Sequence, residues 1–412
     1  MKLYDFPKSY QLFEEAQKYL PNGIYGPRTP TFLTFGSYPA FIKRGLGCRI
    51  WDVDGNEFID YMCSFGTNLL GLKHPKVDAA AKKQWENADC FTLPSDLWLP
   101  LAKTIVETID GLDWCVFGKN GSDVTSYAIT LARVYTGNQD ILLAKGSYHG
   151  SDFVCQPHGH GVPEEWKTHI NYFDYNDVED FKRVWAEHRG QVAGVMLTPH
   201  RHDAMRDQEL PAPAFVDAVN ALAKQDGFLV IIDDIRCGFR LDLAGSAKHY
   251  GWKADIQCFG KAMANGYAIS VAGARRELME AAKTIFFTGT HFFSGVPFAA
   301  ALACIDEIHS SGAIEQIRKM GTLLMKGLEH EARAHDIQVS VTGPPAMPYM
   351  TFADDPLFET NRFFCGQAAR RGIFLHPHHN WFVCAAMQES DIQKTLEVAS
   401  ECFKLTREKL GG

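Results

Sequence analysis

Hydrophobic and polar positions follow different periods in different parts of the chain. Near its start, Phe13, Ala16 and the pair Tyr19-Leu20 recur at helical spacing, which predicts a helix that ends at Pro21-Asn22-Gly23. Between residues 40 and 61, apolar and polar residues alternate on both sides of Asp54-Gly55. This alternation predicts a β-hairpin, because glycine accepts the positive φ that a tight turn requires.

From about residue 65 to residue 310, short apolar runs alternate with longer stretches of helical spacing. Three of these runs are residues 195–197, 228–232 and 256–259, and each is too apolar for a strand with one face in water. Strands that are buried on both faces belong to a mostly parallel sheet covered by helices. The sequence therefore predicts a large α/β domain over residues 65–310.

Helical spacing returns in residues 314–334. It is followed by the strand-like QVSVTG and YMTFA and by a closing helical pattern over residues 390–410. These elements predict a smaller α+β domain over residues 311–412, to which residues 1–64 contribute.

Composition excludes several classes of protein. The 412 residues carry a net charge of −8 without any basic run, so neither nucleic acid nor an anionic membrane is an expected partner. No stretch reaches 18 apolar residues, and the start of the chain lacks the apolar core of a secretory signal. The eleven cysteines form no C-x-x-C pair, which predicts reduced thiols and a cytoplasmic protein.

A first candidate site is the turn Asn120-Gly121-Ser122. It follows the apolar run 114–117 and precedes a helical pattern, so its bare N–H groups and the helix dipole point at one place. This arrangement suits a phosphate dianion. The alternative is an ordinary helix whose N-cap is satisfied by Ser122.

Two further candidates follow the next apolar runs. Asp233 comes directly after residues 228–232, at a strand end where open α/β sheets bind ligands. Lys261 follows residues 256–259, where desolvation would lower its pKa and make its amine a nucleophile able to form a Schiff base. The alternatives are a structural ion pair of Asp233 with Arg236 or Arg240, and a lysine that extends into solvent.

A phosphate turn, an acid and an activatable lysine at strand ends form the set that a pyridoxal phosphate site requires. With the segments PNGIYGPR, NGSDVTSYAITLARVYTG, IIDDIRCGFR and FGKAMANGYAI, the chain resembles the class III aminotransferases of fold type I. Within that family it is similar to the glutamate-1-semialdehyde aminomutase branch. The resemblance covers most of residues 20–310 and implies pyridoxal 5'-phosphate as cofactor.

The resemblance also implies roles for single residues. Lys261 would form the Schiff base and move a proton at the substrate Cα, and Asp233 would keep the pyridine nitrogen protonated. Gly121 and Ser122, with Asn120 before them, match the phosphate-binding turn.

Four more residues match cofactor-binding positions of the family. Tyr148 would stack on the pyridine ring with His149 beside it, and Ile235 would pack on the other face. Either Thr288 or, as the favoured choice, Thr290 would complete the phosphate site of a neighbouring subunit, which implies a homodimer with its active sites at the interface.

The chain departs from the family in two segments. Thr198 to Asp203 replaces a common Glu-Pro sequence, and there either Arg201 or His202 faces the substrate or the segment is a solvated turn. The segment Leu375 to Trp381 lacks a clear carboxylate-binding arginine and offers His376 as a substrate contact instead. We expect no metal there, because its histidines lack a carboxylate or cysteine at ligand spacing.

The sequence thus predicts an aminotransferase that moves an amino group from an amine donor to a carbonyl acceptor in two half-reactions. Similarity to members that aminate sugar or aminocyclitol carbonyls points to an acceptor other than an α-keto acid. An aminomutase or a racemase would use the same residues and stays open as an alternative.

Overall fold

The computed structural model describes residues 3–152 and 160–411, which form two compact units. Unit 1 comprises Met1–His74, Ala204–Gln208 and Glu315–Gly412, and unit 2 comprises Pro75–Asp203 and Glu209–Ile314. The sequence placed the domain boundaries after residues 64 and 310. The short segment Ala204–Gln208 joins unit 1 although it lies between two long stretches of unit 2.

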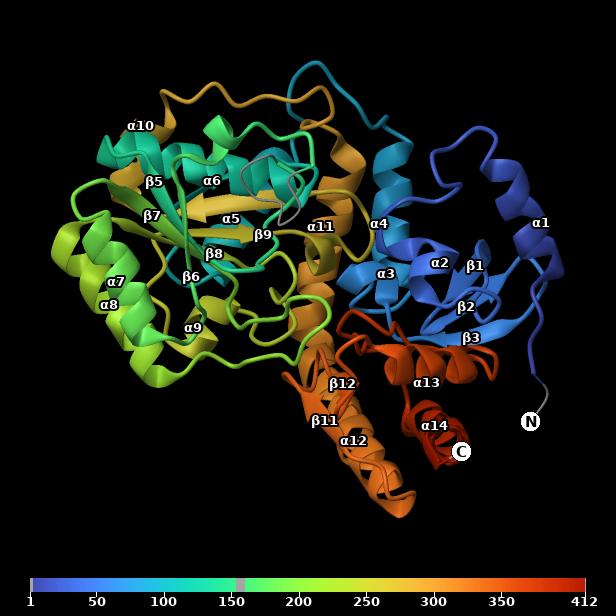
Figure 1. Cartoon of the computed structure of the whole chain (residues 1–412). Helices are drawn as coiled ribbons and strands as arrows, with labels where there is room; N and C mark the ends of the chain where they lie inside the picture. The colour runs from blue at the N-terminus through green and yellow to red at the C-terminus, as the bar shows by residue number, and fades with distance from the viewer. Residues whose placement is uncertain (1–2, 153–159, 412) are drawn as a thin grey trace. The chain divides into compact units, whose positions relative to one another are not determined.

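Unit 2 is built on a seven-stranded sheet (Figure 1). In spatial order its strands are β4 (Trp114–Gly118), β10 (Ser270–Ala274), β9 (Ile256–Phe259), β8 (Leu229–Asp233), β7 (Val192–Leu197), β5 (Asp140–Ala144) and β6 (Ile170–Phe173). The pairs from β9 to β6 are parallel, and β10 runs antiparallel to both of its neighbours. The predicted α/β fold with a mostly parallel sheet is therefore confirmed.

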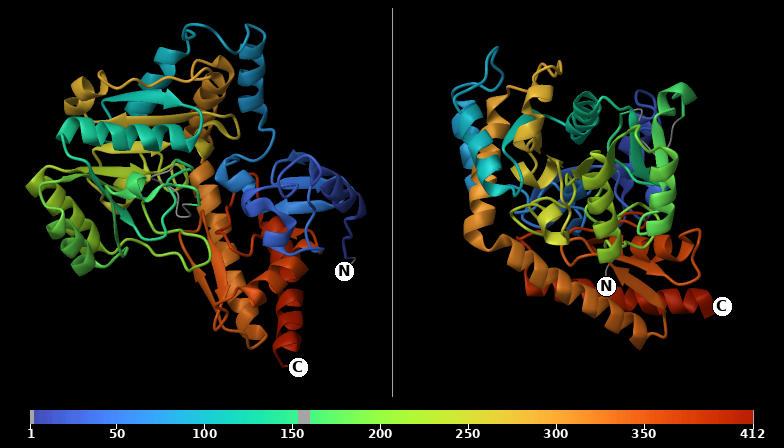
Figure 2. Two further views of the ribbon diagram at one scale, coloured as in Figure 1. Left: turned by 45° about the horizontal axis from the view of Figure 1, so that its top comes forward. Right: turned by 90° about the vertical axis from the view of Figure 1, so that its left-hand side faces the viewer.

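Helices cover both faces of this sheet, and the pleat of β8 shows how. Leu229 and Ile231 belong to the apolar cluster formed with α6 (Gly121–Thr136). Val230 and Ile232 belong to the cluster on the other face, with α7 (Val178–Glu187) and α8 (Pro213–Asp226). Figure 2 shows α6 lying along its face of the sheet. Because side chains alternate along a strand, Asp233 at the end of β8 points to the α6 side.

The other helices of unit 2 surround this core. They are α4 (Pro75–Trp85), α5 (Trp98–Thr108), α9 (Ser246–Tyr250), α10 (Met279–Ala282) and α11 (Gly295–Ser311), with 3₁₀ turns at Glu164–Lys167, Lys261–Ala264 and Arg276–Leu278. Helices α4 and α11 pack on each other, and an ion pair between Lys76 and Glu307 joins them.

Unit 1 contains the predicted hairpin. Strands β1 (Ile42–Leu46), β2 (Arg49–Asp52) and β3 (Glu57–Asp60) pair antiparallel, and β13 (Ile373–Phe374) adds to β3 in parallel. The predicted strands near residues 340 and 350 are β11 (Val339–Thr342) and β12 (Tyr349–Phe352), which pair antiparallel.

The helices of unit 1 are α1 (Pro7–Ala16), α2 (Pro30–Leu33), α3 (Cys63–Gly66), α12 (Ala313–Ala334), α13 (Glu359–Ala369) and α14 (Glu389–Gly411), with a 3₁₀ turn at Gly26–Arg28. Helix α1 ends at Ala16, earlier than the helical spacing predicted, because Tyr19 and Leu20 are exposed and offer no buried face to extend it. Among the described residues, no helix is long and apolar enough to cross a membrane.

Candidate active site

The segments that carry the phosphate turn, Asp233 and Lys261 meet at one edge of the sheet in unit 2. Asp233 pairs with Cys258 in β9, three residues before Lys261. Gly118, which ends β4, pairs with Ser270 of β10, and the Ser270 hydroxyl donates to the Asn120 carbonyl over 2.8 Å. The carboxyl ends of the parallel strands therefore bring the phosphate turn, the acid and the lysine to the same edge, as open α/β sheets do.

Asp233 is held by a buried histidine. His149 Nδ1 lies 2.9 Å from one carboxylate oxygen of Asp233, and both side chains are almost fully buried. The other oxygen accepts a hydrogen bond from the Ile235 N–H over 3.2 Å. The His149 carbonyl in turn accepts from the Thr125 hydroxyl of α6 over 2.7 Å. The sequence placed His149 beside the cofactor but did not identify it as the partner of Asp233.

The turn at the start of α6 is fixed by side chains around it. The Asp123 carboxylate accepts from the N–H groups of Lys119 and Asn120 over 2.8 and 2.7 Å. Ser122 Oγ accepts from the Ser151 N–H over 2.9 Å. With these contacts in place, the N–H groups of Gly121 and Ser122 are the donors of the first helical turn, which has no intrahelical acceptors for them.

Two glycines allow the close packing of this turn. A Cβ on Gly121 would lie 2.8 Å from Ile235 Cδ1, and a Cβ on Gly150 would lie 2.7 Å from Ser122 Oγ. Gly150 also has a φ of +119°, which strongly favours glycine. Ile235 therefore lies directly against the predicted phosphate turn.

Lys261 begins a short 3₁₀ turn just after β9. Its φ is +44°, so a non-glycine residue occupies the left-handed region, which costs about 1 kcal/mol. The three residues that follow it, Ala262 to Ala264, are fully buried and hold the turn in place. Backbone strain of this kind is typical of functional positions, where the surrounding packing enforces it.

Two further predicted cofactor residues are accessible. Tyr148 is 51% exposed, so its ring is open to a planar ligand. Thr290 lies in an exposed segment, and its carbonyl is 3.7 Å from Cys90 Sγ. The role of Thr290 at the phosphate site stays a prediction that concerns a second subunit.

These residues fit pyridoxal 5'-phosphate. In the described part of the chain, the buried Nε2 of His149 has no hydrogen-bond partner, while its Nδ1 contacts the acid that would face the pyridine nitrogen. The turn at Gly121 offers N–H donors and a helix N-terminus to a phosphate. An acid, an anion-binding turn and a lysine on one sheet edge match the ring nitrogen, phosphate and aldehyde of this cofactor.

The segment Thr198 to Asp203 is not the solvated turn that its polar residues suggested. His200 has no exposed surface, and Arg201 is 7% exposed. Arg201 Nε donates to Asp203 over 2.7 Å, and its Nη2 donates to the Lys145 carbonyl over 2.9 Å. The segment is buried because the protein itself neutralises this arginine, which sequence spacing does not reveal.

The two other predicted substrate residues are also buried. His202 is 4% exposed and lies in unit 2, whereas His376 is 2% exposed and lies in unit 1, where its Nε2 is 3.0 Å from the Pro27 carbonyl. Burial lowers the pKa of His376 and that of His378 to about 4, so both imidazoles are neutral near pH 7. A contact of His202 or His376 with a substrate stays a prediction.

Asp234 differs sharply from its neighbour Asp233. It has no exposed surface, and burial raises its pKa to about 8. One of its oxygens accepts from the Ser246 N–H over 2.7 Å. Asp234 is therefore mainly protonated at neutral pH and acts as a structural group on the side of the strand away from His149.

Comparison with known proteins identifies the family of this chain. The model of the family "Aminotransferase class-III" matches residues 35–402. The aminopentol aminotransferase of Sphingopyxis macrogoltabida is 38% identical over 95% of this chain and 93% of its own length. A glutamate-1-semialdehyde 2,1-aminomutase of Desulforamulus reducens is 30% identical over 97% of this chain and 98% of its own.

Solved structures of other proteins are also similar to this chain. The FumI protein of Sphingopyxis sp. MTA144, solved in its PLP internal aldimine form, has a TM-score of 0.96 and 36% identity, with 98% of both chains covered. An omega-transaminase from Sphaerobacter thermophilus has a TM-score of 0.89 at 22% identity and covers 97% of this chain and 98% of its own, which supports the fold alone. The chain belongs to the class-III aminotransferases and is a pyridoxal-phosphate-dependent enzyme.

Proposed function

We propose that the enzyme transfers an amino group by a two-half-reaction, ping-pong mechanism in which Lys261 is the catalytic base and Asp233 the counter-charge of the cofactor ring. The observation that carries this proposal is the buried contact of 2.9 Å between Asp233 and His149, at the edge that also holds Lys261. A binding module that only kept the fold would need neither a buried carboxylate at that edge nor a lysine in a strained backbone conformation.

Each proposed role follows from the surroundings of the residue. When bound, pyridoxal phosphate withdraws electrons from the substrate Cα and so makes its proton removable. Asp233 is oriented by His149 and the Ile235 N–H and would place its carboxylate beside the ring nitrogen. The N–H groups of Gly121 and Ser122 would bind the phosphate, and Tyr148 and Ile235 would position the ring.

Lys261 attaches the cofactor and then acts on the substrate. Once its amine is free, it would take the proton from the substrate Cα and hold it for the second proton transfer of the half-reaction. The left-handed backbone at Lys261 and the buried residues after it fix the position of the Cα atom from which the lysine side chain extends. The same residue serves the donor half and the acceptor half of the cycle.

We propose that one of the two substrates carries no carboxylate next to its reacting carbon. Neutral, buried His376 and His378 lie in the segment where carboxylate-binding relatives carry an arginine, and they offer no positive charge at neutral pH. The similarity to an aminopentol aminotransferase supports a hydroxylated amine, and therefore a hydroxylated carbonyl compound in the reverse direction.

Steady-state kinetics with separate donors and acceptors test the reaction type. We expect parallel lines in double-reciprocal plots when a primary amine donor is varied against a hydroxylated carbonyl acceptor, because the amino group is stored on the enzyme between the two halves. The second measurement is the change in visible spectrum when the amine is added without an acceptor. Turnover of glutamate-1-semialdehyde alone, with no transfer between separate substrates, would instead favour an aminomutase, the activity of several relatives.

We also propose that the enzyme is a homodimer of the reducing cytoplasm. Four large apolar side chains on unit 2 are strongly exposed, as expected for a surface that another chain covers: Trp85 at 68%, Leu93 at 73%, Leu99 at 59% and Phe286 at 93%. The Asp89 carboxylate accepts a hydrogen bond from the Ser294 hydroxyl over 2.6 Å. This bond joins the segment that contains Leu93 to the segment that follows Phe286. All described cysteines are free thiols.

A mixing experiment tests whether Thr290 completes the site of the partner subunit. Lys261→Ala and Thr290→Ala chains are each expected to be impaired, yet their coexpression should restore up to about a quarter of the wild-type rate. Half of the dimers are then mixed, and each mixed dimer has one intact site. Thr288→Ala serves as the matched control for Thr290→Ala. A mixture without recovery, or a monomer by light scattering, would contradict the proposal.

A further inference from the structure

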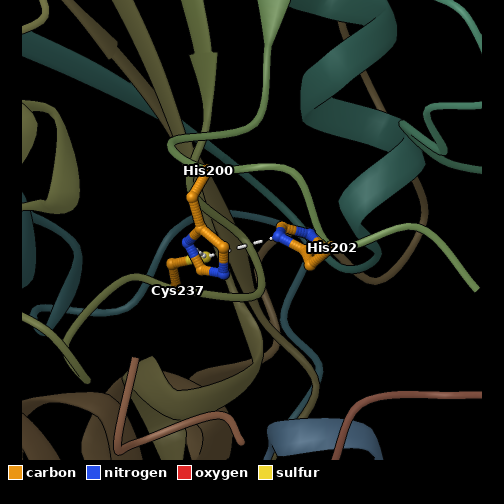
Figure 3. Close-up of side chains that lie close together, drawn as sticks. All are labelled: His200, His202 and Cys237. Atoms are coloured by element: carbon orange, nitrogen blue, oxygen red, sulfur yellow. Dashed lines mark hydrogen bonds between the residues drawn. The ribbon is translucent and has the colours of Figure 1, made fainter. Parts of the chain in front are cut away.

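Three metal-ligating side chains meet inside unit 2, apart from the predicted cofactor residues. His200 and His202 follow β7, and Cys237 follows β8. Cys237 Sγ lies 3.7 Å from His200 Nδ1 and 3.8 Å from His202 Nδ1, and one ligand atom from each residue lies within 4.8 Å of the others. Figure 3 shows the three side chains pointing toward one another.

Burial makes this cluster unusual for polar groups. His200 and Cys237 have no exposed surface, and His202 is 4% exposed. The His200 and His202 rings meet edge to face with centroids 5.0 Å apart. Tyr250 closes another side, with its ring centroid 5.9 Å from that of His200. Water is therefore excluded from the point where the two imidazoles approach the thiol.

The contacts between the thiol and the two imidazoles are weak hydrogen bonds. A thiol has one proton, so it donates to only one of the two Nδ1 atoms, and sulfur is a weak acceptor for the other. A metal ion would replace both weak contacts by strong bonds to all three residues.

The spacing agrees with ligands that share one small ion. With metal–sulfur and metal–nitrogen bonds of about 2.3 and about 2.0 Å, sulfur and nitrogen are about 3.5 Å apart in a tetrahedral site and about 3.7 Å apart in a trigonal one. The observed sulfur–nitrogen distances of 3.7 and 3.8 Å are close to the trigonal value, and the three ligand atoms, which lie within 4.8 Å of one another, would draw together around an ion.

The charges nearby also tolerate a cation. Arg236 is half-buried and donates from Nη1 to the His202 carbonyl over 2.8 Å, and Arg236 and Arg240 both act electrostatically on Cys237, so positive charge is already present. Asp203 and Asp233 both act on Arg236 electrostatically and offset that charge. The thiolate that forms when Cys237 releases its proton to solvent would supply a further negative charge to the ion.

We propose that His200, His202 and Cys237 bind one thiophilic metal ion, zinc(II) or copper(I), in a buried structural site. Thiolate and imidazole ligands favour these ions over magnesium or calcium. The ion would tie the loop after β7 to the loop after β8, and Asp233, the last residue of β8, lies four residues before Cys237. The site would thus fix the strand end that carries the counter-charge of the cofactor.

Metal analysis of the tag-free, cofactor-loaded enzyme tests this site. We expect about one zinc or copper ion per chain after dialysis, and X-ray absorption of that ion should show one sulfur at about 2.3 Å and nitrogens at about 2.0 Å. Replacement of the bound ion by cobalt(II) should give intense d–d absorption bands at longer wavelengths than the absorption of the cofactor. A wild-type enzyme that takes up none of these ions, or an ion without a sulfur neighbour, would overturn the proposal.

Variants then assign the ligands. Cys237→Ser and His202→Asn should weaken metal binding at least about 100-fold, more than the loss of a group that only supports a ligand. Cys258→Ser is the matched control, since Cys258 is equally buried in unit 2 but its Sγ contacts the Val124 carbonyl instead. His378→Asn controls for the histidines of unit 1. Unchanged binding in Cys237→Ser would refute the assignment, and the wild-type absorption measurement decides if that variant does not fold.

Discussion

Replacement of Lys261 by alanine should lower the rate of amino transfer by about 10⁴-fold or more, the largest effect expected of any single substitution in this enzyme. The variant loses the group that moves the proton at the substrate Cα, and proton transfer by a positioned side chain alone contributes up to about 10⁴-fold. It should also lose the visible absorption of the lysine-bound cofactor while still binding the cofactor through the turn at Gly121. Initial rates and absorption spectra measure the two effects.

Lys253→Ala is the matched control for this experiment. Lys253 is an exposed lysine that precedes β9, whereas Lys261 follows it, so both substitutions flank the same strand. The control should keep the spectrum and the rate within about twofold, as surface substitutions usually do. A Lys261→Ala enzyme with substantial activity would show that another lysine is the base.

Replacement of Asp233 by asparagine should lower the rate by about 10²–10³-fold, the range expected when one preorganised charge contact is lost. Asparagine keeps the shape of the side chain and its contact with His149, but it removes the negative charge that faces the ring nitrogen. Cofactor binding should survive, because the phosphate turn and Lys261 are unchanged. The measurements are the rate with saturating cofactor and the cofactor content of the variant.

Asp234→Asn is an unusually close control, since the two acids are adjacent and both buried. With its pKa raised to about 8 by burial, Asp234 is mainly neutral near pH 7, so an amide replaces a group without charge. We expect less than about threefold change in rate there, in line with a volume-conserving change. Equal losses in the two variants would mean that the effect arises from disturbed packing rather than from charge.

Much of the fold follows from patterns that are local in sequence. The apolar runs at 195–197 and 256–259 appear as the buried strands β7 and β9, because strands covered on both faces carry no polar alternation. Asp54-Gly55 lies between β2 and β3 as expected of a hairpin turn. Helix α1 was predicted too long because helical spacing alone does not show whether a buried surface is available.

The candidate site was predictable only in part, for a physical reason. The ends of buried strands are visible in a sequence as the ends of apolar runs, so Asp233 and Lys261 could be placed at one edge. Contacts between distant segments leave no such pattern, and the contact of His149 with Asp233 spans 84 residues. Burial of Thr198 to Asp203 was missed for the same reason, since Arg201 is neutralised in part by Glu209 and by the Lys145 carbonyl. The convergence of His200, His202 and Cys237 likewise has no local signature.

The sheet order of unit 2 has a consequence for how the enzyme matures. Its cofactor edge joins β4, near the start of the unit, to β8 and β9 through β10, which is the last strand of that sheet along the chain. Because contacts between distant segments form slowly, the phosphate turn and Lys261 come together only after most of the unit has folded. The appearance of cofactor absorption would therefore mark the final stage of refolding. During synthesis, the nascent chain must extend beyond residue 274 before it can retain the cofactor.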